Sequence, residues 1–119
     1  MKDTIMWWMS RLTIMLTSLF LSFALAAQAY AADITMGSNG NLVFEPNDIT
    51  INAGDTVTFT NGALPPHNMV VADHPELSHG DLAFALGDSF DVTFAEAGDY
   101  NFQCDPHAGA GMKGVIHVK

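Results

Sequence analysis

The chain has a single cysteine, Cys104, among its 119 residues. One cysteine cannot form a disulfide within the chain and is too few for an iron–sulfur cluster, so neither can stabilise the fold. The thiol is therefore an inert buried side chain, a reactive group or a metal ligand. Bound metal would add stability that a small domain without disulfides lacks.

Long apolar runs are scarce as well. The longest, Leu12–Ala26, is about fifteen residues, whereas a membrane-spanning helix needs roughly twenty. It follows a short start with two basic residues and precedes the small residues of "AQAYAAD", a layout typical of a secretory signal peptide. We expect residues 1–31 to be cleaved after Ala31, leaving residues 32–119 as one exported domain. An uncleaved membrane anchor is the alternative.

Basic side chains are few: four Lys and Arg residues stand against thirteen Asp and Glu residues, for a formal net charge of −9. Within residues 32–119 only Lys113 and Lys119 remain against twelve acidic residues, a net charge of −10. Such a surface repels nucleic acid and anionic membranes, so we expect neither as a partner. Acidity favours a basic protein partner reached by electrostatic steering, or simply serves solubility.

The domain does contain short segments in which apolar and polar residues alternate, separated by Gly-Asp and Asn-Gly turns. Period-two alternation predicts strands with one buried and one wet face, as in an all-β two-sheet sandwich. Residues 73–86 lack this alternation, so we expect a loop with a helical turn there. The predicted strands are 33–37, 42–46, 48–54, 56–62, 67–72, 89–94, 99–104 and 114–119.

The nine-residue stretch "CDPHAGAGM" places Cys104, His107 and Met112 close together in sequence. The Asp-Pro pair after the cysteine forces a turn, which allows the imidazole of His107 to fold back toward the sulfur. Residues 108–111 are all Ala or Gly, so the backbone can curl tightly and return the methionine to the same centre. The stretch predicts that a thiolate, an imidazole and a thioether converge.

A fourth ligand has to come from elsewhere in the fold. His67 is the best-placed histidine, because the two prolines of "LPPHN" fix its backbone at the start of a predicted strand. Two imidazoles, one thiolate and a weak thioether form the ligand set of a blue copper electron-transfer site, whereas zinc prefers four strong ligands. The remaining histidines are expected to be ordinary surface residues: His74, His79 and His117.

Three stretches resemble plastocyanins, particularly the cyanobacterial kind, across residues 33–119: "FEPNDITINAGDTVTFTNGALPPHN", "ELSHGDLAFALGDSFDVTFAEAGDYNFQC" and "CDPHAGAGMKG". The Cys, His and Met spacing alone is shared with pseudoazurins, but "PHN" together with "PHAGAGM" is more specific. The resemblance implies the cupredoxin fold of the type 1 blue copper family, a Greek-key β-sandwich of about eight strands. It implies one copper ion per chain, bound by His67, Cys104, His107 and Met112.

The same resemblance implies roles around the metal. Asn68 is expected to hydrogen-bond to the loop that carries Cys104, and the exposed edge of His107 is expected to lie in an apolar patch that faces partners. Two partner-facing positions depart from the family: Gln103 stands where a tyrosine is usual, and Ala108 where cyanobacterial members usually carry a basic residue. By position the patch comprises Leu42, Leu64, Pro65, Pro66, Gly109 and Ala110.

The function that the resemblance implies is one-electron shuttling from cytochrome f of the cytochrome bf complex to photosystem I. The protein is expected to be a soluble monomer in the thylakoid lumen, or in the periplasm, and not an enzyme. A copper oxidase or nitrite reductase fragment would need a second copper site and a longer chain. Two alternatives stay open: a pseudoazurin-like periplasmic donor to a different reductase, and a copper carrier without an electron-transfer role.

Overall fold

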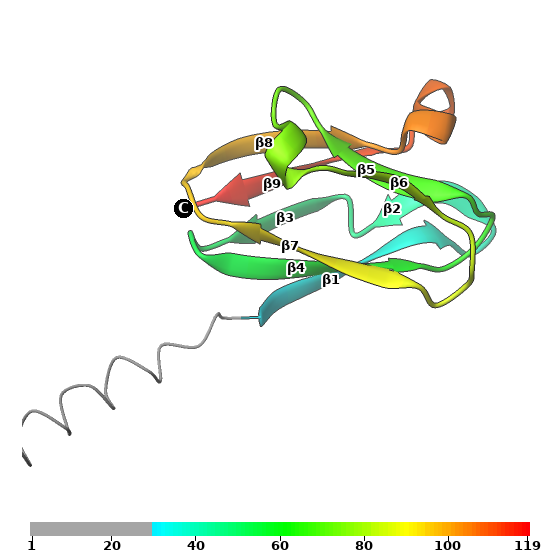
Figure 1. Ribbon diagram of the computed structural model, residues 1–119, viewed down its shortest axis with the longest axis horizontal. Helices are drawn as coiled ribbons and strands as arrows, with labels where there is room; N and C mark the ends of the chain where they lie inside the picture. The colour runs from blue at the N-terminus through cyan, green and yellow to red at the C-terminus, as the bar shows by residue number, and fades with distance from the viewer. Residues whose placement is uncertain (1–29) are drawn as a thin grey trace, which may run out of the picture.

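A computed structural model describes residues 30–119 of the chain (Figure 1). Nearly all of the predicted signal peptide, residues 1–31, therefore lies outside the described residues. In the described part, no helix is both long and apolar enough to cross a membrane. The strands are β1 (Tyr30–Ser38), β2 (Asn41–Glu45), β3 (Asp48–Ile51), β4 (Asp55–Asn61), β5 (His67–Val71), β6 (His79–Ala83), β7 (Ser89–Phe94), β8 (Gly98–Gln103) and β9 (Lys113–Val118). Two short 3-10 helices, η1 (Pro75–Leu77) and η2 (Asp105–Ala110), lie in the connections.

The strands form two sheets that face one another (Figure 1). One sheet has the order β2-β1-β4-β7 and the other the order β3-β9-β8-β5-β6. The β1–β4 and β3–β9 pairs are parallel, and the other pairs are antiparallel. The all-β two-sheet sandwich predicted from the alternating segments is confirmed.

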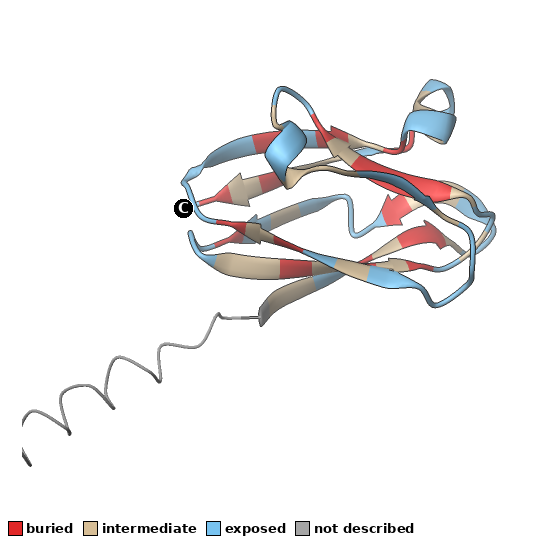
Figure 2. Ribbon diagram, in the orientation of Figure 1, coloured by how far each residue is buried: buried red, intermediate tan, exposed pale blue. Residues whose placement is uncertain are grey.

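Aromatic rings from both sheets meet in the core between them. Phe102 of β8 packs edge-on against Phe44 of β2, with ring centroids 4.7 Å apart, and against Phe59 of β4 at 5.8 Å. Edge-to-face pairs of this kind each add about 0.5–1.5 kcal/mol beyond the burial of their surface. All three rings belong to the alternating segments, and buried residues recur along the strands of both sheets (Figure 2).

Residues 30–119 form nine strands rather than about eight, because the segment 73–86, expected to be a loop with a helical turn, also contains β6. The helical turn is present as η1. The sequence pattern missed β6 because it is an edge strand, paired only with β5, and none of its five residues is fully buried. A strand exposed on both faces has no buried side to impose alternation.

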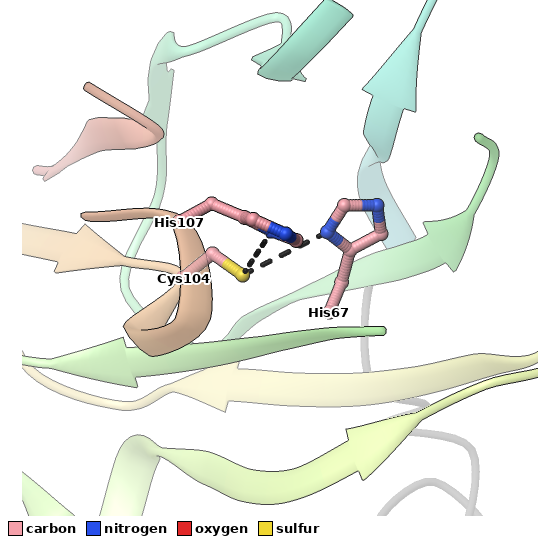
Figure 3. Close-up of side chains that lie close together, drawn as sticks. All are labelled: His67, Cys104 and His107. Carbon is pink, nitrogen blue, oxygen red and sulfur yellow. Dashed lines mark hydrogen bonds between the residues drawn. The ribbon is translucent and has the colours of Figure 1, made fainter. Parts of the chain in front are cut away.

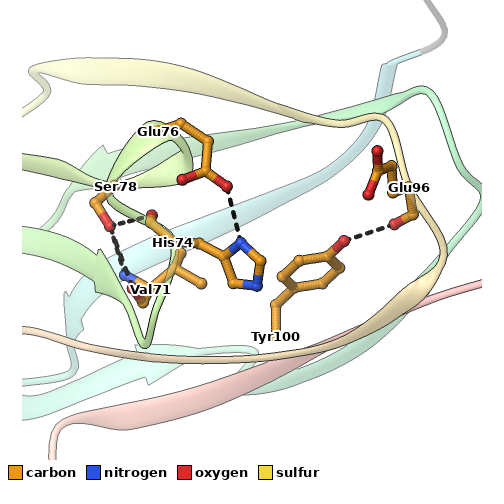
Figure 4. A network of polar contacts seen from close by, with 6 residues as sticks. All are labelled: Val71, His74, Glu76, Ser78, Glu96 and Tyr100. Atoms are coloured by element: carbon orange, nitrogen blue, oxygen red, sulfur yellow. Dashed lines mark hydrogen bonds and ion pairs between the residues drawn. The ribbon is translucent and has the colours of Figure 1, made fainter.

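A polar network holds the connection between β5 and β6 (Figure 4). The Ser78 hydroxyl accepts a hydrogen bond from the Val71 N–H at 2.8 Å and donates one to the His74 carbonyl at 2.9 Å. The His74 ring packs against the ring of Tyr100, whose hydroxyl donates to the Glu96 carbonyl at 2.8 Å. These bonds satisfy the backbone groups of a tight turn and fix the chain as it leaves β5.

His117 lies on β9 between carboxylates of the two neighbouring strands. Its Nδ1 lies 2.7 Å from Asp99 on β8, and its Nε2 lies 3.2 Å from Asp48 on β3. The hydrogen bond with Asp99, reinforced by the negative charge of Asp48, raises the pKa of His117 above its ordinary value. The protonated ring therefore links three strands of one sheet.

A His117→Gln variant is expected to change how stability depends on pH. Because the folded-state pKa of His117 lies above its value in the unfolded chain, its contribution is complete below about pH 6.5 and is lost as pH rises through the folded-state pKa. Urea unfolding of wild type and variant, measured at intervals of about 0.5 pH units from about pH 5.5 to about pH 8.5, checks this. The difference between them should shrink with rising pH, and a difference constant across the range would contradict it.

Candidate metal centre

Three ligand-type side chains converge at one end of the sandwich (Figure 3). Cys104 follows directly on β8, and its Sγ lies 3.7 Å from Nδ1 of His67, the first residue of β5. It lies 3.5 Å from Nδ1 of His107 in η2. All three ligand atoms are within 4.8 Å of one another, and within residues 30–119 no other group of His, Cys, Asp or Glu is gathered in this way. The spacing suits a single metal ion.

Backbone bonds within the ligand loop bring Met112 back to Cys104. The Cys104 N–H donates to the Met112 carbonyl at 3.1 Å, and the Met112 N–H donates to the His107 carbonyl at 3.3 Å. Gly111, with φ of 88°, ends η2 in a left-handed conformation that a side chain would strain. The Met112 side chain is fully buried. The tight curl predicted from the small residues of the loop is present.

His67 is held in one tautomer. Its Nε2 hydrogen-bonds to the Ala63 carbonyl oxygen, which can only accept, so this nitrogen carries the proton. The other nitrogen, Nδ1, then presents its lone pair, and it is the nitrogen that faces Cys104. A hydrogen bond that orients a histidine in this way is typical of metal ligands.

Gly37 supports the site, although nothing in the sequence alone assigns it this role. It has φ of 79°, and a Cβ on it would lie 2.0 Å from the Ala63 carbonyl oxygen and 2.8 Å from Nε2 of His67. The β1–β2 register shifts at this point, between Met36 and Ser38. A lone glycine in a strand signals a bulge or a close backbone approach, but the sequence does not say to which atoms. Here the close approach is to the hydrogen bond that orients His67.

Asn68 ties the ligand loop to its neighbours. Its Oδ1 accepts a hydrogen bond from the Asp105 N–H at 2.8 Å, and its Nδ2 donates to the Gly80 carbonyl at 3.0 Å. The side chain is buried. One amide therefore joins β5, β6 and the loop that begins at Cys104, and the hydrogen bond expected from Asn68 to this loop is present.

An Asn68→Ala variant is expected to lower the free energy of unfolding by about 1–3 kcal/mol, because it removes two hydrogen bonds, with the Asp105 N–H and the Gly80 carbonyl, that are each worth about 0.5–1.5 kcal/mol. Urea unfolding measures this loss. The matched control is Asn101→Ala on exposed β8 surface, which should change stability by at most about 0.5 kcal/mol. Equal effects of the two substitutions would show that the Asn68 bridge contributes nothing.

Burial sets the protonation of the site. It raises the pKa of the Cys104 thiol, and the backbone N–H groups of Asn68 and His107 oppose this rise. Burial, followed by electrostatic repulsion from the neighbouring His67 ring, lowers the pKa of His107. A protonated, buried thiol is a poor nucleophile, while a neutral imidazole is ready to bind metal. The raised pKa of Cys104 argues against a reactive thiolate, and the convergence of two imidazole nitrogens on the sulfur argues against an inert side chain. Of the three roles open to Cys104, the geometry therefore favours that of a metal ligand.

The other predicted residues can now be placed. His74, His79 and His117 lie outside the three-residue cluster, but His79 is not a simple surface residue: it is half-buried and its ring stacks on Phe90 with centroids 3.9 Å apart. None of the residues of the predicted partner-facing surface is fully buried. Leu64, Pro65, Gly109 and Ala110 are exposed, and Leu42, Pro66, Gln103 and Ala108 are half-buried.

Known proteins share both the sequence and the fold of this chain. The profile of the family described as "copper binding proteins, plastocyanin/azurin family" matches residues 31–119. The chain belongs to this family. It is 45% identical over 98 residues to plastocyanin of Scenedesmus fuscus, covering 73% of this chain and 100% of that protein. It is 44% identical over 103 residues to chloroplastic plastocyanin of Hordeum vulgare, covering 79% of this chain and 66% of that protein, slightly less than two thirds of its length.

The oxidised form of plastocyanin from Dryopteris crassirhizoma has the same fold, with a TM-score of 0.66 and 34% identity over 74% of this chain and 100% of that one. The resemblance to plastocyanins, the cupredoxin fold and the copper cofactor expected from the sequence are thereby confirmed. The protein is a plastocyanin-like blue copper electron carrier and not an enzyme. That it is of the cyanobacterial kind stays a prediction.

Proposed function

We propose that the protein carries single electrons from cytochrome f of the cytochrome bf complex to photosystem I, with copper held by His67, Cys104, His107 and Met112. The observation that carries this proposal is the convergence of two imidazole nitrogens and one thiol at the end of a plastocyanin-like sandwich. Export to the thylakoid lumen, through a signal peptide at residues 1–31, is part of the same proposal.

Copper supplies the one-electron redox chemistry. The chain keeps water from the site, because His67, Cys104 and Met112 are fully buried. His107 is half-buried, so its outer edge is where a partner can approach the site. The hydrogen bonds from His67 to Ala63 and from the loop to Asn68 hold the donor atoms in fixed positions. Fixed ligands limit the rearrangement that accompanies a change of charge.

Transient binding suits this task. The net charge of −10 on residues 32–119 favours a partner with a basic surface and accelerates their encounter. The exposed Leu64, Pro65, Gly109 and Ala110 provide a small apolar surface near His107. Short-lived redox complexes bury less than about 1,200 Å² in total. We infer that the protein acts as a monomer.

The test is to load the purified domain, residues 32–119, with Cu(II) and to follow its oxidation by photosystem I at increasing salt. An intense blue thiolate-to-copper band is expected, and the oxidation rate should fall as salt screens the acidic surface. Absence of the band would contradict the copper site. A blue protein that neither accepts electrons from cytochrome f nor donates them to photosystem I would point to a copper carrier or to a different reductase.

A further inference from the structure

Three large apolar side chains are exposed on one short segment at the end of β6. Leu82, Phe84 and Leu86 have 41%, 66% and 67% of their surface accessible, and we call these three residues the apolar ledge. Single exposed apolar residues are ordinary, but a cluster on an otherwise charged surface marks a contact site. Within the residues that the structure describes, the only other large apolar side chain this exposed is Leu64.

The ledge lies beside the metal centre. Ala83, in the middle of the segment, pairs with His67 across the β5–β6 ladder. The connection from β6 to β7, which carries Phe84 and Leu86, lies at the same end of the sandwich as η2 and its His107 (Figure 1), and it is exposed (Figure 2). A partner that approaches the half-buried His107 therefore comes to the end of the molecule that carries the ledge.

Asn61 holds the ledge in a fixed shape. Its side chain is 1% exposed, and its Nδ2 donates to the carbonyls of Ala83 at 3.1 Å and Ala85 at 3.0 Å. Its backbone accepts from the Gly87 N–H and donates to the Asp88 carbonyl, both at 2.8 Å. Four hydrogen bonds from one residue pin the segment on both sides of Phe84 and Leu86. A surface already held in place loses little conformational entropy on binding.

We propose that the apolar ledge is a docking element for the redox partner, and that it receives an apolar patch bordered by basic side chains. This inference rests on the proposed function and adds a second contact surface to the one around His107. Charge selects the occupant: Asp81 and Asp88 flank the ledge, and the domain carries a net charge of −10. Two copies of this chain repel one another, as does an anionic membrane, whereas a basic rim is attracted.

The test compares wild type with a Phe84→Ser, Leu86→Ser double variant. The second-order rate constants for reduction by cytochrome f and oxidation by photosystem I are measured at several salt concentrations. We expect the rate constant of the double variant to fall about tenfold with at least one partner, which corresponds to the loss of about 1.4 kcal/mol of apolar contact. Salt screens charges but not apolar contacts, so the ratio of wild-type to variant rates should stay constant as salt rises. The blue band shows that the metal site of each variant is intact. A Phe84→Leu variant, which keeps an apolar side chain at this position, should retain most of the wild-type rate.

The matched control is Ala95→Ser, Ala97→Ser, two exposed positions between β7 and β8, at the opposite end of the sandwich (Figure 1). It should keep wild-type rates. If the double variant reacts with both partners at rates within about twofold of wild type, the docking role of the ledge is overturned but the proposed function is not. A wild-type dimer, or binding to neutral phosphatidylcholine vesicles, that the double variant abolishes would also overturn it, by assigning a different occupant. A blue wild-type protein that reacts with neither cytochrome f nor photosystem I would overturn the proposed function. It would also overturn the assignment of these proteins as partners of the ledge.

Discussion

Replacement of Cys104 by serine is expected to abolish the intense visible absorption of the copper-loaded protein and to lower copper affinity by more than about a hundredfold. Loss of a residue that only orients a ligand already costs roughly 10–100-fold. Cys104 is the sole thiol in the chain, and its Sγ lies within 3.7 Å of both imidazole nitrogens. A hydroxyl is neither soft nor readily ionised, so serine cannot replace the thiolate.

The control for this substitution is Ala108→Ser, which introduces the same side chain into the same loop and keeps every predicted ligand. Copper titration followed by absorption and competition with a chelator of known affinity measures both variants. Circular dichroism shows whether each is folded. A Cys104→Ser protein that is folded and retains the band would show that the ligand assignment is wrong.

A Gly37→Ala variant is expected to lose about 3 kcal/mol or more of unfolding free energy and to weaken copper binding. The new methyl would lie 2.0 Å from the Ala63 carbonyl oxygen, a backbone atom, so β1 and the connection between β4 and β5 have to separate locally. Overpacking and backbone strain at one site each cost about 1–3 kcal/mol. Movement of the Ala63 carbonyl also disturbs the hydrogen bond that orients His67.

Gly40 provides the matched control for this substitution. It also has a positive φ, of 73°, but a Cβ there meets nothing within 4 Å. Gly40→Ala therefore incurs the left-handed backbone penalty of about 1–2 kcal/mol without the clash. Urea unfolding of the copper-free proteins and copper titration compare the two variants. Equal losses would show that close packing at Gly37 is unimportant to the site.

The buried parts of the fold could be predicted from the sequence, because burial of one face imposes a pattern. β4 and β7 alternate clearly, and their inward residues Val57, Phe59, Val92 and Phe94 belong to the core. The convergence at the metal centre could be predicted for a different reason. Cys104, His107 and Met112 are separated only by turn-forming and small residues, so the local chain brings them together.

Features that depend on contacts between distant segments could not be predicted in this way. β6 carries no burial pattern, so the sequence predicts a loop where this strand lies. Asn61 has the sequence appearance of a turn residue, and only the fold shows that its amide reaches Ala83 and Ala85. Gly37 supports His67 through a contact across about thirty residues of chain. Such contacts leave no local signal, because the strands that create them are brought together only by the sandwich.

His67 and Cys104 are 37 residues apart along the chain, so copper binds the folded state more tightly than the unfolded state. The unfolded chain keeps the short Cys104–Met112 segment but has to close a long loop to recruit His67, at an entropic cost. Binding that favours the folded form stabilises it by mass action, in proportion to the logarithm of free metal over its dissociation constant. Copper supply to the compartment would then regulate how long this small acidic domain survives proteolysis.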